Sequence, residues 1–197
     1  MSGNKLSRII YWDACVYLAW LKAEESHGKD CLDAIRFAAK ESSEGLIVIV
    51  TSTITFIEVL SAHLTEEQER LFRRSFRSQH HTARDVDPPV AMKARDFRQR
   101  LLCNPSGKTL ATPDAIHLAT AQIYDAEFWT FDNGGKGKSI GLLELDGDAR
   151  IDGLKICKPW APKMEASAQK IHESEQWELF NGVAAYQIPV HVFMPPI

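Results

Sequence analysis

Two kinds of apolar pattern alternate along the chain. Short continuous apolar runs predict strands, and longer segments with an apolar residue every three or four positions predict helices. The predicted strands are residues 6–12, 46–50 and 127–131, with 154–157 as a candidate further strand. The predicted helices are residues 14–25, 31–40, a segment carrying 56–60, 90–102 and 115–123. Strands that alternate with helices are typical of a mostly parallel central sheet, so we predict the α/β class and a three-layer α/β/α sandwich.

Local signals mark where several helices begin and end. Residues 65–84 are rich in charge, and we expect a polar helix, or a helix and a loop, that ends before Asp87 and two prolines. Thr112 and Pro113 mark a helix start, with Thr112 as the cap and Pro113 at the first helical position. The hydroxyl residues 51–53 are suited to capping the helix that follows them.

The composition of the chain changes near residue 159. We predict that residues 1–159 form one domain and that residues 160–197 are a C-terminal extension. Within the extension, residues 164–178 have a polar helical pattern, and residues 183–193 suit an extended hairpin or arm. The apolar stretch 190–197 would suit a contact with a partner.

Length, charge and cysteine content narrow the class of protein. The chain has 197 residues, 45% of them hydrophobic, which is enough to bury one core. A net charge of −3 argues against a general coat of positive charge for binding nucleic acid, although a local basic patch is compatible with it. Apolar runs far shorter than the roughly 20 residues of a membrane span predict a cytoplasmic protein with no membrane contact. Four scattered cysteines predict reduced thiols.

Acidic residues follow the predicted strands. Asp13 and Asp132 come directly after strands, and Glu58 lies within the first two helical turns after another. Asp114 opens a helix whose preceding loop could reach the same edge of the sheet. Ligands of open α/β sheets bind beyond the carboxyl ends of the strands, so we expect these four carboxylates to converge.

Converging carboxylates favour a bound cation. Like charges a few ångströms apart raise one another's pKa and resist joint ionisation, and a hard divalent cation removes this conflict. Oxygen ligands without a histidine and cysteine cluster suit Mg²⁺ or Mn²⁺ better than zinc. A cation held in this way can activate water and neutralise charge on a phosphoryl oxygen, which is the chemistry of phosphodiester hydrolysis.

Each acid also has a purely structural interpretation. Asp114 could be a first-turn carboxylate favoured by the helix dipole, and Glu58 could be a solvated helix residue. Asp13 or Asp132 could be a helix cap or a turn former. The context favours a functional role over a purely structural one, because Glu58 stands in an apolar stretch and Asp13 and Asp132 each end a strand.

Four segments carry these acids in a specific order. They are IIYWD at 9–13, TST at 51–53 with EVL at 58–60, TPDAIHLATA at 112–121 and WTFD at 129–132. Together they resemble the PIN domain family and, within it, the VapC-like ribonuclease toxins. The resemblance covers roughly residues 8–159, and the segment around Asp114 is its strongest part.

The resemblance implies a function and a site. Its metal-binding acids would be Asp13, Glu58, Asp114 and Asp132, holding one or two Mg²⁺ or Mn²⁺ ions, with Thr130 as a neighbour that orients them. It also implies a ribonuclease acting on RNA as the toxin of a toxin–antitoxin pair, with an antitoxin as partner and a homodimer as assembly. The alternative is a PIN-like RNA- or protein-binding module with little or no nuclease activity. The presence of all four acids favours the enzyme.

Two basic segments are candidate contacts to RNA. One is a set of arginines spaced three or four apart, which would share a helix face: Arg70, Arg73, Arg74 and Arg77. A solvated face paired with neighbouring glutamates is an equal alternative. Lys136 and Lys138 lie in a glycine-rich loop and could reach the substrate, although a mobile surface loop is the favoured interpretation.

Two further residues bear on other chemistry. A phosphatase with an aspartyl nucleophile would need a second acid two positions after Asp13, and Cys15 stands there instead. His117, one turn past Asp114, could donate to a phosphate. A packed helix histidine is the favoured interpretation, because the sequence names no partner for it.

Overall fold

One sheet of five parallel strands forms the centre of the molecule. The computed structural model describes residues 8–102, 107–134 and 137–162. The strands are β1 (Arg8–Trp12), β2 (Ile47–Ser52), β3 (His81–Arg84), β4 (Glu127–Trp129) and β5 (Ile156–Cys157). Their order across the sheet is β3-β2-β1-β4-β5, and every neighbouring pair is parallel. The predicted parallel sheet is therefore confirmed, with β1 at its centre.

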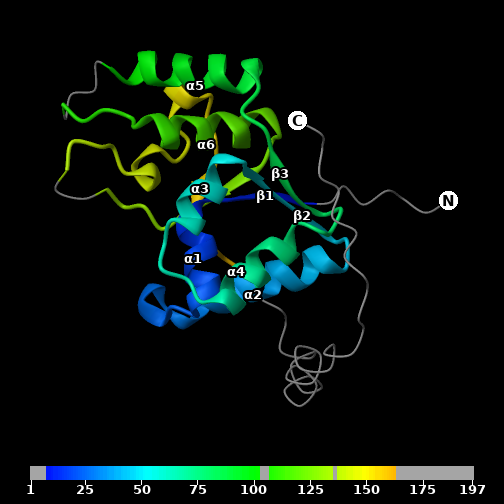
Figure 1. Cartoon of the computed structure of the whole chain (residues 1–197). Coiled ribbons are helices and arrows are strands. Elements are labelled where there is room, and N and C mark those ends of the chain that lie inside the picture. The colour runs from blue at the N-terminus through cyan, green and yellow to red at the C-terminus, as the bar shows by residue number, and fades with distance from the viewer. Residues whose placement is uncertain (1–7, 103–106, 135–136, 163–197) are drawn as a thin grey trace, which may run out of the picture. The chain divides into compact units, whose positions relative to one another are not determined.

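Helices cover both faces of the sheet, as the alternation of patterns predicts (Figure 1). One layer contains α1 (Ala14–Lys22), α2 (Lys29–Ser43) and α4 (Glu66–Ser75), and the other contains α5 (Pro88–Leu101) and α6 (Thr112–Ile123). The short helix α3 (Ile54–Leu60) follows β2 and contacts α1. Three 3-10 turns complete the described elements: Glu25–His27, Leu142–Leu145 and Ala149–Ile151. The result is the predicted three-layer α/β/α sandwich.

Side chains of β1 alternate between the two helical layers. Tyr11 packs in the cluster under α5 and α6, whereas Ile10 and Trp12 pack on the side of α1, α2 and α4. All three are fully buried. A strand buried on both faces consists of consecutive apolar residues, so the sequence pattern identifies it. Directly beyond the run, the Asp13 N–H still donates to the Trp129 carbonyl (3.2 Å), so Asp13 stands at the sheet edge.

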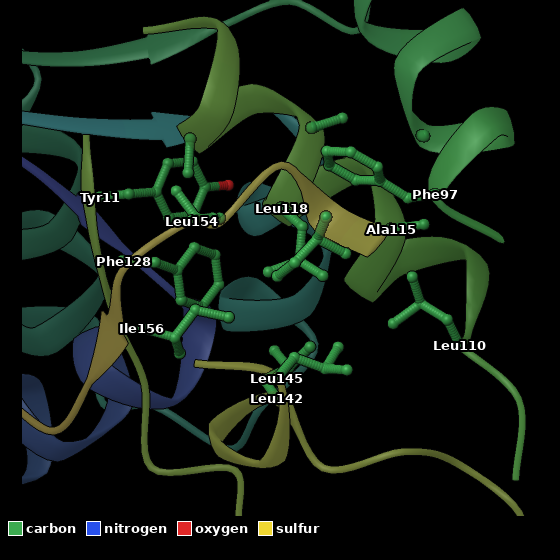
Figure 2. Close-up of a cluster of buried hydrophobic side chains, with 14 of the residues drawn as sticks. Tyr11, Phe97, Leu110, Ala115, Leu118, Phe128, Leu142, Leu145, Leu154 and Ile156 are labelled. Carbon is green, nitrogen blue, oxygen red and sulfur yellow. The ribbon is translucent and has the colours of Figure 1, made fainter. Parts of the chain in front are cut away.

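Aromatic and aliphatic side chains fill the space between the sheet and α6 (Figure 2). The rings of Tyr11 and Phe128, on neighbouring strands, stack with their centroids 5.0 Å apart and their planes 8° apart. Leu118 from α6 and Phe97 from α5 belong to the same buried cluster. Fully burying one such side chain contributes about 1.5–3 kcal/mol. This packing fixes α6, and therefore Asp114 in its first turn, against the sheet.

Residues 81–84 differ from the sequence prediction. The helical part of the charged segment is α4, capped by Thr65 and Gln68, but the segment ends in the edge strand β3 instead of a helix or loop. His81 lies buried in β3, with Nε2 2.7 Å from the Tyr17 hydroxyl, and burial lowers its pKa to about 3. The strand is four residues long and mostly polar, so no apolar run marks it in the sequence.

The predicted helix caps at Thr112 and residues 51–53 also differ. Helix α6 begins at Thr112 itself, with Ala111 in the cap position, which places Pro113 second in the helix. Thr53 occupies the cap position of α3, but its side chain makes no cap hydrogen bond. Thr51 Oγ1 instead donates to the Trp12 carbonyl (2.9 Å) and lies 2.7 Å from Thr55 Oγ1. The Thr51 hydroxyl therefore binds the end of β2 to the end of β1, and of the three hydroxyls it is that of Ser52 that accepts from α3, from the Ile54 N–H (3.5 Å).

The remaining predictions concern the membrane, the thiols and the extension. Across residues 8–102, 107–134 and 137–162, no helix has the length and apolar character to cross a membrane. Cys15, Cys31 and Cys157 are free thiols. A compact unit runs to Ala161, and the domain boundary at residue 159 stays a prediction. The predicted helix 164–178 and arm 183–193 lie outside the described residues.

Glu127 connects three parts of the sheet. Its Oε1 accepts hydrogen bonds from Arg8 Nη2 (2.6 Å), Trp129 Nε1 (2.8 Å) and Trp160 Nε1 (2.5 Å), and its Oε2 accepts from Lys155 Nζ (2.7 Å). Burial raises the pKa of Glu127, but the hydrogen bonds from Lys155, Trp129 and Arg8 outweigh it and lower the pKa to about 2. The carboxylate thus joins β1, β4 and the residues on either side of β5.

We expect Glu127→Gln to destabilise the protein by about 2–3 kcal/mol at pH 7, because the charged partners lose their carboxylate. The folded-state pKa lies below the unfolded one, so this contribution exists above about pH 4.5 and is lost as pH falls towards 2. Urea unfolding of both proteins at pH 7, 5 and 3.5 measures the difference, with the exposed Glu67→Gln as control. A difference that stayed constant with pH would contradict the prediction.

Candidate functional site

Asp13 is a buried carboxylate at the C-terminal end of β1. It caps α1, and its Oδ1 accepts a hydrogen bond from the Ala14 N–H (2.7 Å). Its Oδ2 accepts from Thr130 Oγ1 (2.7 Å) and from Cys15 Sγ (3.2 Å). Asp13 is only 8% exposed, so these donors hold its position firmly. The predicted structural role as a helix cap and the predicted role in a site therefore coexist in one residue.

Glu58 and His117 come from different helices and meet beside Asp13. Glu58 Oε2 on α3 lies 2.7 Å from His117 Nε2 on α6. The same Nε2 is 3.9 Å from Asp13 Oδ1. His117 is 1% exposed, whereas the Glu58 side chain is 31% exposed. Together these three residues offer ligand atoms that all lie within 4.8 Å of one another.

Asp114 lies one turn before His117, in the first turn of α6. Burial raises the pKa of its carboxyl group, and the negative charge of Asp13 raises it further. His117 opposes this increase, but Asp132 and Glu58 add to it, and the resulting pKa is about 6. Within the described part of the chain, no group donates a hydrogen bond to the Asp114 carboxylate. The negative charge of Asp114 is therefore repelled by the neighbouring carboxylates, and no hydrogen bond from the described residues offsets this repulsion.

Asp132 follows β4 and braces the loop after it. Its Oδ1 accepts from the Gly134 N–H (2.8 Å), and its Oδ2 accepts from the Leu142 N–H (3.1 Å). Gly134 has φ +68°, and a Cβ there would come within 2.9 Å of the Gly141 nitrogen, so glycine is required. The predicted turn-forming role of Asp132 is thus present, and its charge also reaches Asp114.

Thr130 joins two of the acids, in line with the predicted orienting role. It is fully buried, donates through Oγ1 to Asp13 and accepts at the same oxygen from the Asp132 N–H (3.1 Å). This hydroxyl uses its single hydrogen on the carboxylate, so its direction is fixed. The two acids at the ends of β1 and β4 therefore keep one relative placement.

The structure brings the four predicted acids to one edge of the sheet in two ways. Asp13 and Glu58 meet directly, with His117 between them in reach of both. Asp114 and Asp132 lie outside that group of close ligand atoms. They are still within electrostatic range of it, because the charges of Asp13, Glu58 and Asp132 all raise the pKa of Asp114. Sequence reasoning favoured a packed histidine at 117 and so missed its partner. The available signal was its spacing, since residues three apart share a helix face.

The residues present fit a hard divalent cation. The group is dominated by carboxylate oxygens, which Mg²⁺ and Mn²⁺ prefer. Burial and the negative charge of neighbouring carboxylates raise the pKa of Asp114, and a cation would stabilise its charged form against both. Asp13 and Glu58 offer carboxylate oxygens close enough to share such an ion, and Asp114 and Asp132 stay predicted ligands beside them.

The basic candidates for RNA contact lie on the surface. Arg70, Arg73, Arg74 and Arg77 are exposed, on α4 or just after it, and Arg73 pairs with Glu69 at 3.7 Å, as the solvated-face alternative expects. Lys138 is exposed in the loop after Asp132, and Lys136 lies outside the described residues. A role in binding RNA stays a prediction for all of them.

Comparison with known proteins decides the family. The family model of the PIN domain matches residues 10–136. This is more than half of the 197 residues, and it includes all four acids. The chain belongs to the PIN domain family. The resemblance of its motifs to PIN domains is therefore confirmed.

Several solved structures are similar to this PIN domain. A chain in the crystal structure of VapBC2 from Rickettsia felis bound to a DNA fragment from their promoter is 14% identical, with a TM-score of 0.51 over 76% of this chain and 98% of that one. A chain of a toxin–antitoxin complex from Klebsiella pneumoniae is 18% identical, with a TM-score of 0.47 over 78% of this chain and 99% of that one. FitAcB from Neisseria gonorrhoeae is 16% identical, with a TM-score of 0.46 over 78% and 99%. No curated protein matches the sequence.

We expect Asp114→Asn to make the metal-free PIN domain more stable at pH 7.5, by about 1–3 kcal/mol, because it removes one of several mutually repelling charges. The pKa of about 6 exceeds the unfolded value of 3.8, so the wild type loses stability as pH rises through this interval. The difference between the two proteins should therefore vanish below about pH 4.

Chemical denaturation in the presence of chelator, at pH 4, 5, 6 and 7.5, measures this difference. Asp33→Asn is a matched control, since Asp33 is exposed on α2 and pairs with Arg36, another exposed residue of the same helix. Equal or lower stability of the Asp114 variant at pH 7.5 would show that the charges do not repel as described.

Proposed function

We propose that this PIN domain is a Mg²⁺- or Mn²⁺-dependent ribonuclease. The observation that carries the proposal is the cluster of carboxylates at the sheet edge, where the pKa of Asp114 is raised to about 6 by burial and neighbouring negative charge. Such a cluster is costly for folding and is typical of a site built for a cation. Membership of the PIN domain family supports the same proposal, because the family model matches residues 10–136 and so covers all four acids.

Each residue has a distinct part in this proposal. Asp13, Glu58, Asp114 and Asp132 hold the cation, and Asp132 also shapes the loop beside the site. When bound, the cation lowers the pKa of a water molecule and neutralises charge on a phosphoryl oxygen of RNA. The Asp114 carboxylate accepts the proton of the attacking water, since no hydrogen-bond donor in the described residues occupies it. Thr130 keeps Asp13 in place.

The thiol beside the site has no catalytic part in this reaction. Burial raises the pKa of Cys15 well above its usual value, and the charge of Asp13 raises it further. Its Sγ donates to Asp13 Oδ2 and accepts from the Phe131 N–H (3.2 Å). A protonated, hydrogen-bonded thiol is neither a nucleophile nor the second acid of an aspartyl phosphatase. It serves as a further donor to Asp13.

We also propose that the protein is the toxin of a toxin–antitoxin pair, with a small antitoxin as its partner and a homodimer as its assembly. The motifs resemble those of VapC-like toxins, and the fold is shared with a chain of VapBC2, whose structure contains promoter DNA.

The exposed arginines after Thr65 and the lysines after Asp132 would guide the RNA strand through contacts to its phosphates.

Cleavage of a labelled structured RNA tests the enzyme. We expect cutting with Mg²⁺ or Mn²⁺, no cutting with chelator, and a loss of at least about 100-fold in Asp13→Asn and Asp114→Asn. Asp33→Asn should cut at the wild-type rate, because its carboxylate lies on the exposed face of α2.

Two outcomes would overturn the proposal. Cutting that persists in both site variants would point to a contaminating nuclease. Metal binding without cutting of any RNA, including total cellular RNA, would favour a PIN-like module that binds RNA or protein.

A further inference from the structure

A chain of hydrogen bonds runs from the backbone of β2 to the Glu58 carboxylate. The Ser52 N–H donates to the Tyr11 hydroxyl oxygen (2.9 Å), this oxygen lies 2.6 Å from His117 Nδ1, and His117 Nε2 lies 2.7 Å from Glu58 Oε2. Tyr11 and His117 are 106 positions apart and both are buried. The chain therefore connects three secondary-structure elements through the core to one partly exposed acid.

The direction of each hydrogen bond follows from the donors available. The Ser52 N–H can only donate, so it occupies a lone pair of the Tyr11 oxygen. A phenol has one hydrogen to donate, and His117 Nδ1 lies 2.6 Å from the Tyr11 oxygen, in position to accept it. A neutral imidazole that accepts at Nδ1 carries its hydrogen at Nε2. His117 therefore donates from Nε2 to the Glu58 carboxylate.

This direction decides what His117 can do beside a cation. Asp13, Glu58 and His117 are close enough to hold a metal ion together, and geometry alone does not separate the histidine from the acids. A ring nitrogen that carries hydrogen has no lone pair to give to a metal. His117 is thus excluded as an Nε2 ligand while the chain from Ser52 is intact.

Glu58 needs such a support more than the other acids do. It stands on the seven-residue helix α3, its side chain is 31% exposed, and within the described part of the chain His117 is its hydrogen-bond donor. A free glutamate side chain must lose rotamer freedom worth up to about 1.5–2 kcal/mol before it can hold an ion. One bond from a buried, rigid imidazole fixes Oε2 and leaves Oε1 for the metal.

We propose that Tyr11 and His117 form a relay that positions Glu58 as a metal ligand, with His117 acting through Glu58 and never binding the metal itself. The proposal rests on the proposed metal site, and it names two positioning residues outside the four acids. Outer hydrogen-bond partners of metal ligands are commonly worth 10- to 100-fold in metal affinity. We expect an effect of this size when the relay is cut.

Mn²⁺ titration followed by electron paramagnetic resonance tests the relay without any RNA. We expect Tyr11→Phe and His117→Phe to keep the fold and to weaken Mn²⁺ binding by about 10-fold or more. Tyr124→Phe is the matched control for Tyr11→Phe, since Tyr124 belongs to α6's C-terminal cap and its ring contacts Arg84. It should bind Mn²⁺ as the wild type does. Unchanged affinity in both relay variants, with circular dichroism showing intact folding, would overturn the proposal.

Two spectroscopic readouts separate a positioning residue from a ligand. Nitrogen-15 NMR of the imidazole should show a hydrogen on His117 Nε2, and electron spin-echo spectroscopy of bound Mn²⁺ should show no directly coordinated histidine nitrogen. A bare Nε2, or a coordinated nitrogen that disappears in His117→Phe, would overturn the relay even if RNA is cleaved. Correct spectra and weakened Mn²⁺ binding without RNA cleavage would sustain the relay and overturn the ribonuclease.

Discussion

Mutual repulsion among carboxylates is the constraint on which the rest of this PIN domain depends. Asp13, Asp114 and their neighbours carry like charges at one edge of the sheet, and burial together with these charges raises the pKa of Asp114 to about 6, which lowers the stability of the fold at neutral pH. The fold tolerates this repulsion because packing away from the site sets the positions of the acids. Stacked rings of Tyr11 and Phe128, and Leu118 from α6, hold the strands and the helix that present the acids. Packing in the core therefore sets the positions of the acids, and repulsion among the acids lowers the stability of the fold.

Much of this arrangement could be predicted because it is encoded locally. A buried central strand is a continuous apolar run, so β1 and β2 are visible in the sequence, and an acid directly after such a run must stand at the sheet edge. Asp13 and Asp132 follow from this rule. Asp114 follows from its place in the first turn of a helix that begins near the same edge. Glu58 follows from its place in an apolar stretch within the first two helical turns after a strand.

What could not be predicted depends on pairing between distant residues. β3 is a short polar edge strand whose identity comes from hydrogen bonds to β2 and from the burial of His81 against Tyr17. His117 has the same difficulty, because its partners Tyr11 and Glu58 lie 106 and 59 positions away. A histidine with no visible partner is best interpreted as packing, and here it is both packed and directed at the site. Local sequence patterns predict in which helix or strand a residue lies. Which partner a buried polar side chain contacts is known only from the tertiary structure.

The brace formed by Asp132 has a consequence for how this site can vary. One carboxylate holds both the Gly134 and the Leu142 amides, and Gly134 lies against Gly141, so the two ends of the loop are joined to each other. The stretch between these ends can change in length or composition without shifting the acid that closes it. Variation within this loop would therefore leave the arrangement of the carboxylates unchanged.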